Sequence, residues 1–158
     1  MRVAIGSDHA GFELKQILIE ELESLGDQVT DFGTDSVESC DYPDIAEPLA
    51  RAVAANEHDI GVLLCSNGVG PSMVANKIHG VRCGLCHDTF SARRAREHTN
   101  CNILAMGAWA IGRGAAVDVL MAFRNAEFEG GRHERRLSKL NAIDEAMRRD
   151  APASGTTS

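Results

Sequence analysis

The chain has 158 residues and a net charge of −7, so it has room for a single core and is too acidic for a general nucleic-acid-binding protein. No apolar run approaches the ~20 residues that a membrane-spanning helix needs, and the first residues lack the apolar segment and cleavage site of a signal peptide. We therefore expect a cytoplasmic protein without nucleic-acid or membrane partners, with one domain over residues 1–148 and a polar, disordered tail over residues 149–158.

Short apolar runs alternate with helical patterns along the whole chain. In chain order we expect strand 2–7, helix 12–26, strand 28–33, helix 43–55, strand 59–65, helix 71–78, strand 81–87, helix 88–98 with Asp88 as its N-cap, strand 101–107, helix 112–124, and a charged helix that ends near residue 149. Five strands that alternate with helices indicate an α/β fold, in which helices cover both faces of a five-stranded parallel sheet. The pattern predicts a three-layer, Rossmann-like arrangement.

Ligands of such sheets bind beyond the carboxyl ends of the strands. Several polar residues follow the expected strands and should gather at that edge: Asp8, His9, Asp41, Tyr42, Cys65, His87 and Asp88. This edge is therefore the expected place of a binding or catalytic site.

The turn SNGVGPS, residues 66–72, connects a buried strand to a helix. The backbone amides at a helix N-terminus, together with the helix dipole, favour an anion. The turn matches neither a Walker loop nor the G-x-G-x-x-G fingerprint of dinucleotide-binding proteins. An anion-binding turn and an ordinary strand-to-helix connection both fit this pattern.

Cys65 directly precedes this turn. Amides at a helix N-terminus stabilise a thiolate, and a thiolate there is suited to remove a proton from a carbon next to a carbonyl group. The same amides would then stabilise the enediolate oxygen that forms. The alternative is a small buried apolar side chain, which is the usual place of a lone cysteine.

His98 is expected at the end of a helix, at the edge of the sheet opposite the carboxyl ends of the strands. It therefore meets Cys65 only with the help of a second copy of the chain, and a helix C-terminal cap is the alternative. Arg132 and Arg136 are four residues apart, which places both guanidiniums on one helix face where they suit a phosphate group. A solvated charged helix is the alternative for this pair.

Cys83 and Cys86 form a C-x-x-C motif in an expected strand, where residues three apart point to opposite faces. A zinc site needs two further ligands nearby, and a redox motif usually opens a helix. We interpret the pair as two small core side chains, with thiol redox chemistry as the weaker alternative.

Together these segments resemble the type B ribose-5-phosphate isomerases and the related galactose-6-phosphate isomerase subunits. The resemblance covers roughly residues 1–148 and rests on GSDHAGFELK (6–15), DYPD (41–44), LLCSNGVGPSMVANK (63–77), VRCGLCHD (81–88), AREHTNCNIL (95–104) and FEGGRHERRLSKL (128–140). It implies an aldose-ketose isomerase that acts on a sugar phosphate through a cis-enediolate, as a homodimer or a dimer of dimers. The C-terminal helix would reach a partner subunit, and each active site would be shared. No metal and no organic cofactor is implied.

The resemblance also implies a role for each matching residue. Cys65 would carry the proton between C1 and C2, and Asp8 and His98 would open the sugar ring. The anion hole for the enediolate would consist of Ser66, Asn67, Gly68, Val69 and Gly70. Tyr42 would line the sugar site, and His9, Arg132 and Arg136 would hold the phosphate, some of them from the partner.

Three positions depart from the family pattern. Asn67 replaces a threonine or serine whose hydroxyl assists proton transfer, Thr99 replaces an asparagine after the catalytic histidine, and Trp109 stands where many members have a phosphate-binding arginine. An amide cannot donate a hydroxyl proton. The resemblance therefore does not decide which sugar phosphate is preferred. A non-catalytic sugar-phosphate-binding subunit or sensor on the same fold is the alternative function.

Overall fold

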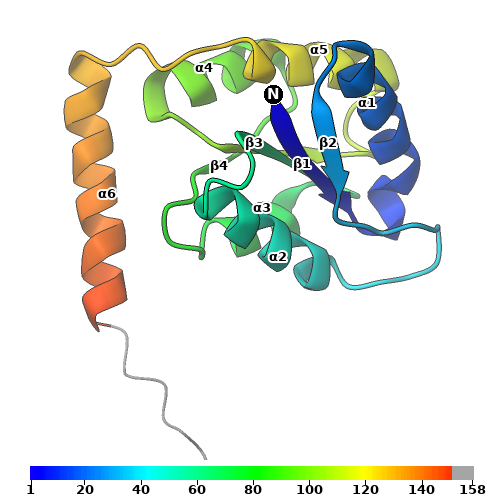
Figure 1. Ribbon diagram of the computed structural model, residues 1–158, viewed down its shortest axis with the longest axis horizontal. Helices are drawn as coiled ribbons and strands as arrows, with labels where there is room; N and C mark the ends of the chain where they lie inside the picture. Colours follow the sequence, from blue (N-terminus) through cyan, green and yellow to red (C-terminus); the bar gives the residue numbers. More distant parts are fainter. Residues whose placement is uncertain (151–158) are drawn as a thin grey trace, which may run out of the picture.

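The computed structural model describes residues 1–150 and contains one five-stranded sheet (Figure 1). Its strands are β1 (Arg2–Ser7), β2 (Gln28–Asp31), β3 (Ile60–Cys65), β4 (Cys83–Leu85) and β5 (Ile103–Gly107). All pairs are parallel and the strand order is β2-β1-β3-β5-β4. The predicted parallel α/β architecture is confirmed.

The helices follow the expected order, with small shifts at their ends. They are α1 (Phe12–Ser24), α2 (Tyr42–Ala54), α3 (Val69–Ala75), α4 (Thr89–Thr99), α5 (Arg113–Arg124) and α6 (Arg132–Asp150), with a short 3₁₀ turn, η1 (His9–Gly11). Asp88 caps α4 as predicted, because its Oδ1 accepts the Ser91 N–H at 2.7 Å. Helix α6 continues to Asp150, and the rest of the expected tail, residues 151–158, lies outside the described residues.

The sheet is buried on both faces. Alternate strand residues pack against α1, α4 and α5 on one face, and against α2 and α3 on the other. Figure 1 shows these two helix layers above and below the strands. The expected strand 81–87 is much shorter in the structure because β4 is an edge strand that pairs only with β5. Among residues 1–150, none of the helices combines the length and apolar content that crossing a membrane requires.

Asp27 ties three distant parts of the chain together. Its side chain is 1% exposed and accepts hydrogen bonds from the terminal amine of Met1 at 2.6 Å and from Arg124 at 2.6 and 2.7 Å. The hydrogen bonds from Arg124, and those from the terminal amine, hold the pKa of Asp27 below its ordinary value. This buried ion pair fixes the end of α5 against the start of β2.

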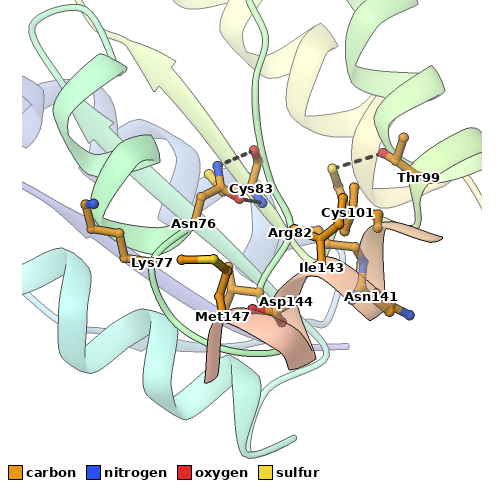
Figure 2. A pocket seen from close by; sticks show the side chains of 12 residues that line it. Asn76, Lys77, Arg82, Cys83, Thr99, Cys101, Asn141, Ile143, Asp144 and Met147 are labelled. Atoms are coloured by element: carbon orange, nitrogen blue, oxygen red, sulfur yellow. Dashed lines mark hydrogen bonds between the residues drawn. The ribbon is translucent and has the colours of Figure 1, made fainter. Parts of the chain in front are cut away.

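Helix α6 stands apart from the two helix layers (Figure 1). Its second half is attached through Asp144, whose Oδ2 accepts the Gly80 N–H at 3.0 Å and pairs with His79 at 2.8 Å. Leu140, Ile143 and Met147 on this helix are 45%, 66% and 68% exposed. A groove of about 600 Å³ separates α6 from the edge of the sheet, and Figure 2 shows Ile143 and Met147 beside Cys83 and Cys101 there. The helix therefore presents apolar side chains that its own chain leaves partly uncovered.

Candidate active site

The carboxyl ends of β1, β3 and β5 meet at one edge, where backbone hydrogen bonds connect the loops that follow them. The Asp8 N–H donates to the Leu64 carbonyl at 3.3 Å, and the Ala108 N–H donates to the Cys65 carbonyl at 2.8 Å. The Trp109 N–H donates to the Ser66 carbonyl at 3.0 Å. The residues predicted at this edge are therefore held by a connected backbone network.

Cys65 is the last residue of β3 and its side chain lies at the start of the glycine turn. The residue is 4% exposed, and its Sγ accepts the Gly68 N–H at 3.0 Å. Gly68 has a φ of +77°, and a Cβ on it would lie 2.5 Å from Leu85 and 2.8 Å from the Met106 backbone. Only glycine fits this turn, which folds back so that an amide points at the sulfur. A backbone N–H is the kind of donor that a cysteine sulfur at the start of a helix accepts.

Asn67 uses its side chain inside the turn. Its Oδ1 accepts the Val69 N–H at 3.0 Å and lies 3.7 Å from the sulfur of Cys65. The amides of Gly68 and Val69, both predicted for the anion hole, thus already have partners within the chain. In an Asx turn, the side-chain oxygen of an asparagine accepts a hydrogen bond from the backbone amide two residues ahead, as it does here. The amide oxygen of Asn67 is therefore the atom that faces the thiol.

Tyr42 packs on the turn, and Asp8 and His9 follow the neighbouring strand β1. A Cβ on Gly70 would lie 2.6 Å from the ring of Tyr42, so this ring packs directly on the turn. Asp8 is 8% exposed, and its Oδ1 accepts the amides of Ala10 and Gly11 at 3.0 and 3.2 Å. The Nδ1 of His9 accepts the Cys40 N–H at 3.3 Å. The structure therefore brings these three side chains to the edge that holds Cys65.

His87 supports the same turn, although the sequence assigned it no role. Its Nε2 accepts the Gly107 N–H at 2.8 Å. A Cβ on Gly107 would lie 2.5 Å from the Cα of Asn67, so the end of β5 touches the turn backbone. His87 and Gly107 are far apart in sequence from the turn, which is why no local pattern indicated this contact.

Trp109 is 78% exposed and lies at this edge as well. It lines a small hollow of about 190 Å³ with Ala10, Glu13 and Arg113. The indole is therefore next to the turn that holds His9, one of the predicted phosphate ligands.

His98, Thr99 and Arg136 gather elsewhere, around a hollow of about 190 Å³ between α4 and α6. Helix α4 ends at the start of β4 and β5, where Arg82 Nε donates to the Asn100 carbonyl at 2.8 Å. These residues thus lie at the opposite edge of the sheet from Cys65, as the topology predicted. Arg132 precedes His133 at the start of α6 and belongs to the same group.

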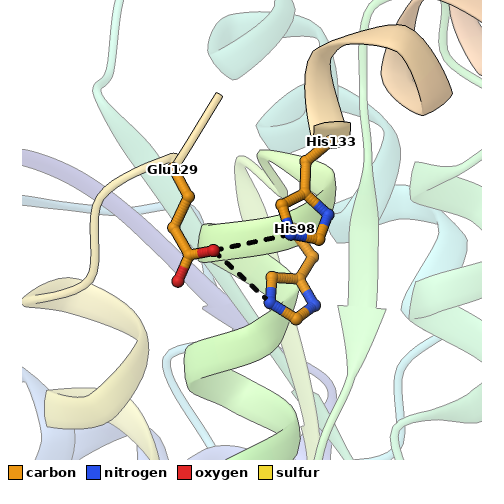
Figure 3. Close-up of side chains that lie close together, drawn as sticks. All are labelled: His98, Glu129 and His133. Carbon is orange, nitrogen blue, oxygen red and sulfur yellow. Dashed lines mark ion pairs between the residues drawn. The ribbon is translucent and has the colours of Figure 1, made fainter. Parts of the chain in front are cut away.

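A cluster of His98, Glu129 and His133 forms at this second place (Figure 3). The two imidazole rings are stacked, with centroids 3.9 Å apart and planes 9° from parallel. The Oε2 of Glu129 lies 3.7 Å from His98 Nε2 and 3.5 Å from His133 Nε2. Burial, together with the charges of His98 and Arg132, lowers the pKa of His133.

These three side chains are metal-ligand types, and their ligand atoms lie within 4.8 Å of one another. Two features oppose a metal ion there. Arg94 lies 3.2 Å from His98 Nε2 and Arg132 donates to His133 Nε2 at 3.3 Å, so a positively charged side chain stands beside each Nε2 and would repel a metal cation. The lone pairs of parallel stacked rings also run side by side and do not converge on one point.

Cys83 and Cys86 are separate and free, like the other three cysteines. Cys83 packs with the core on one face of the sheet, and Cys86 belongs to the core on the other. Burial raises the pKa of Cys83 and raises the pKa of Cys86 to about 11. Cys83 is partly buried and Cys86 is buried, and the raised pKa values of both thiols support the interpretation as core side chains and leave the redox alternative without a reactive thiolate.

The sequence from residue 3 to residue 140 matches the model of the Ribose/Galactose Isomerase family. The chain belongs to this family. It is 42% identical over 148 residues to "Ribose-5-P isomerase B" of Listeria innocua, which covers 94% of this chain and 100% of that one. It is 41% identical over 141 residues to "D-erythrulose-4-phosphate isomerase" of Pectobacterium atrosepticum, which covers 89% of this chain and 93% of that one.

The fold of the family is shared as well. The solved structure of ribose-5-phosphate isomerase B from Clostridium thermocellum superposes with a TM-score of 0.91 at 42% identity, over 92% of this chain and 99% of that one. The resemblance found from the motifs, and the fold that it implies, are therefore confirmed.

Proposed function

We propose that the protein is a sugar phosphate isomerase that interconverts an aldose phosphate and a ketose phosphate, with Cys65 as the base. The observation that supports this most directly is that Cys65 Sγ, at the end of β3, accepts a hydrogen bond from the Gly68 N–H at 3.0 Å. The relatives in the Ribose/Galactose Isomerase family are named as sugar phosphate isomerases and support this activity.

In the proposed reaction the Cys65 thiolate removes the proton from C2 of the open-chain aldose, and the electrons move to O1 to form a cis-enediolate. The proton of the O2 hydroxyl moves to O1, and the same sulfur returns its proton to C1. The C2=O2 carbonyl of the ketose forms in this step. Because Asn67 Oδ1 is held by the Val69 amide, its Nδ2 group is the donor available to an enediolate oxygen. Asn67 would thus stabilise the intermediate electrostatically, in place of the hydroxyl found in other members.

We further propose that each active site is shared between two copies of the chain. Cys65, Asp8 and His9 lie at one edge of the sheet, and the group around His98 and Arg136 lies at the other. The uncovered apolar side chains of α6 provide a surface on which a second copy can dock and bring the two groups together. Some phosphate contacts would then come from Arg132 and Arg136 of the second copy.

Mixing two inactive variants tests the shared site. With ribose 5-phosphate as the substrate, Cys65→Ala and His98→Asn would each be inactive alone, because every site then needs both ring opening and proton transfer. Subunit exchange between them would restore up to about one quarter of the wild-type sites, since half of the random dimers are mixed and each holds one intact site. Mixtures that stay inactive, although exchange is shown by mass spectrometry, would contradict the shared site.

The substrate is proposed to be a phosphorylated sugar of four or five carbons. Relatives of nearly equal identity are named for ribose 5-phosphate and for D-erythrulose 4-phosphate. Asn67 is larger than threonine, and Trp109 places an apolar plane beside the turn that carries His9. Turnover of ribose 5-phosphate and erythrose 4-phosphate, measured as formation of ketose, would identify the preferred chain length. Tight binding of one of them without any turnover would favour the non-catalytic binding subunit instead.

The five free cysteines support the proposed cytoplasmic location. Free thiols are typical of a reducing compartment, where disulfides are rare.

A further inference from the structure

Two glycines place Glu129 and His133 over the end of α4. Gly130 and Gly131 have φ values of +65° and +57°, a backbone conformation that side-chain-bearing residues rarely adopt. The Glu129 N–H donates to the Glu97 carbonyl at 3.0 Å, and the His133 N–H donates to the Gly130 carbonyl at 3.0 Å. This turn fixes both side chains next to His98.

The charged groups around His98 come from three segments. Helix α4 provides Arg94, whose Nη1 is shared between Glu97 at 2.8 Å, His98 at 3.2 Å and Glu129 at 3.4 Å. The loop before α6 provides Glu129, and α6 provides the stacked His133. Arg132 and Arg136 of α6 complete the set: Arg132 donates to His133, and Arg136 lines the hollow beside His98. The two charged partners of the His98 ring, Arg94 and Glu129, both meet it at Nε2.

Of the two stacked rings, His133 is the one that stays neutral. Its side chain is 4% exposed, against 31% for that of His98, so a charge on the His133 ring would lose far more of its contact with water. Burial and the neighbouring cationic groups lower its pKa, which agrees with this assignment. Two stacked imidazoliums would repel each other, so the pair holds at most one extra proton. The negative charge of Glu129 is therefore available to stabilise a proton on His98.

We propose that Glu129 and His133 are positioning residues for His98 in opening the sugar ring. Glu129 holds the Nε2 side of the imidazole, and the neutral ring of His133 fixes its plane, so that Nδ1 faces the substrate. This inference rests on the proposed isomerase function and on the role of His98 in it.

The proton balance of the step is simple. The Nδ1–H of the His98 imidazolium gives its proton to the ring oxygen, while the Asp8 carboxylate takes the proton of the O1 hydroxyl. The C1–O4 bond breaks and the C1=O1 bond forms, which leaves the open-chain aldose. Neutral His98 then keeps its Nε2–H toward Glu129, so the carboxylate stabilises the charged form from which the proton is delivered.

The chemistry of the substrates separates this step from proton transfer at carbon. Ribose 5-phosphate closes a five-membered ring through O4 and must be opened first. Ribulose 5-phosphate has its carbonyl at C2 and its O5 blocked by phosphate, so it stays open. A residue needed only for ring opening thus affects the reaction from the aldose and not the reaction from the ketose.

The test compares both directions in Glu129→Gln, which keeps the shape of the side chain and removes its charge. We expect the rate from ribose 5-phosphate to fall about tenfold to a hundredfold, and the rate from ribulose 5-phosphate to stay within about twofold. Glu134→Gln, an exposed glutamate on the first turn of α6, is the matched control and should change neither rate. An equal loss in both directions would show a merely structural role for Glu129 and overturn the proposal.

Variants of His133 test the stacked plane. His133→Phe keeps a flat neutral ring and should retain most of the rate from ribose 5-phosphate, whereas His133→Ala should lose it while keeping the rate from ribulose 5-phosphate. If both variants fold and the phenylalanine variant loses as much of the rate from ribose 5-phosphate as the alanine variant, the neutral ring of His133 does not position His98.

Nitrogen-15 spectra of the histidine rings give a readout that needs no turnover. Through the pH range in which His98 titrates, His133 should stay neutral in the wild type. A spectrum in which His133 takes the proton first would overturn the inference even if the protein is an active isomerase. A wild type that turns over neither pentose phosphate would contradict the proposed pentose substrate, and the spectra would still decide the assignment of the proton.

Discussion

Gly107 allows the most direct structural test of the catalytic turn. A Cβ added at this position would lie 2.5 Å from Asn67 Cα, 2.6 Å from Asn67 C and 2.8 Å from Asn67 O. All three are backbone atoms, which cannot rotate away as a side chain can. To reach an ordinary contact of 3.4 Å, the turn that begins at Cys65 has to retreat by about 0.9 Å.

This displacement sets the expected size of the effect. Overpacking of this kind costs about 1–3 kcal/mol, which lowers the melting temperature by about 3–9 °C in a domain of this size. A misplacement of about 1 Å in a catalytic group costs on the order of 100-fold in rate. We therefore expect Gly107→Ala to fold, to melt earlier, and to lose about tenfold to a hundredfold in kcat for the isomerisation.

Gly114→Ala is the matched control, because this glycine lies in α5 with no atom within 4 Å of the added Cβ. Alanine is the better helix former by about 0.5–1 kcal/mol, so this variant should melt slightly later and keep its activity. The assay is a thermal melt together with ketose formation from the aldose phosphate. If Gly107→Ala melts and reacts like the wild type, the turn does not depend on close contact with β5.

Three further outcomes follow from charge and burial. Burial raises the pKa of Cys86 to about 11, so brief alkylation by iodoacetamide at pH 8 should label Cys40 and spare Cys86, and equal labelling by mass spectrometry would refute this. Because Arg124 lowers the pKa of Asp27, their ion pair stabilises the fold above about pH 4 and is lost as the pH falls through the lowered pKa. Arg124→Gln should therefore lower the melting temperature strongly at pH 7 and much less at pH 3; an equal change at both would refute this. Ile143→Glu places a charge on the apolar face of α6 and should give a monomer by light scattering, whereas a persistent dimer would exclude this face as the interface.

The order and type of the main elements could be predicted from the sequence, because each strand is a short apolar run and each helix has its own periodic pattern. The length of β4 could not, since the run VRCGLCH fits a central strand, and only the sheet order shows that this strand has one neighbour. Edge strands have fewer hydrogen bonds to extend them.

The place of the site was predictable for a similar reason. Asp8, Cys65 and Tyr42 follow successive strands, and parallel topology brings such residues to one edge. Two contacts around the proposed catalytic groups were not predictable, because they join residues distant in sequence. His87 meets Gly107, and His133 stacks on His98 across a turn with two left-handed glycines. The hydrogen bond from the Val69 amide to Asn67 Oδ1 depends on the conformation of the turn after Cys65.

The central claim is that the sulfur of Cys65 moves the proton between the two carbons of the sugar phosphate. Incubation with the preferred substrate in deuterated water, followed by proton NMR, measures the exchange of the C2 proton directly. We predict that Cys65→Ala folds like the wild type and shows no enzyme-dependent exchange. Exchange at the wild-type rate in this variant would mean that another group is the base.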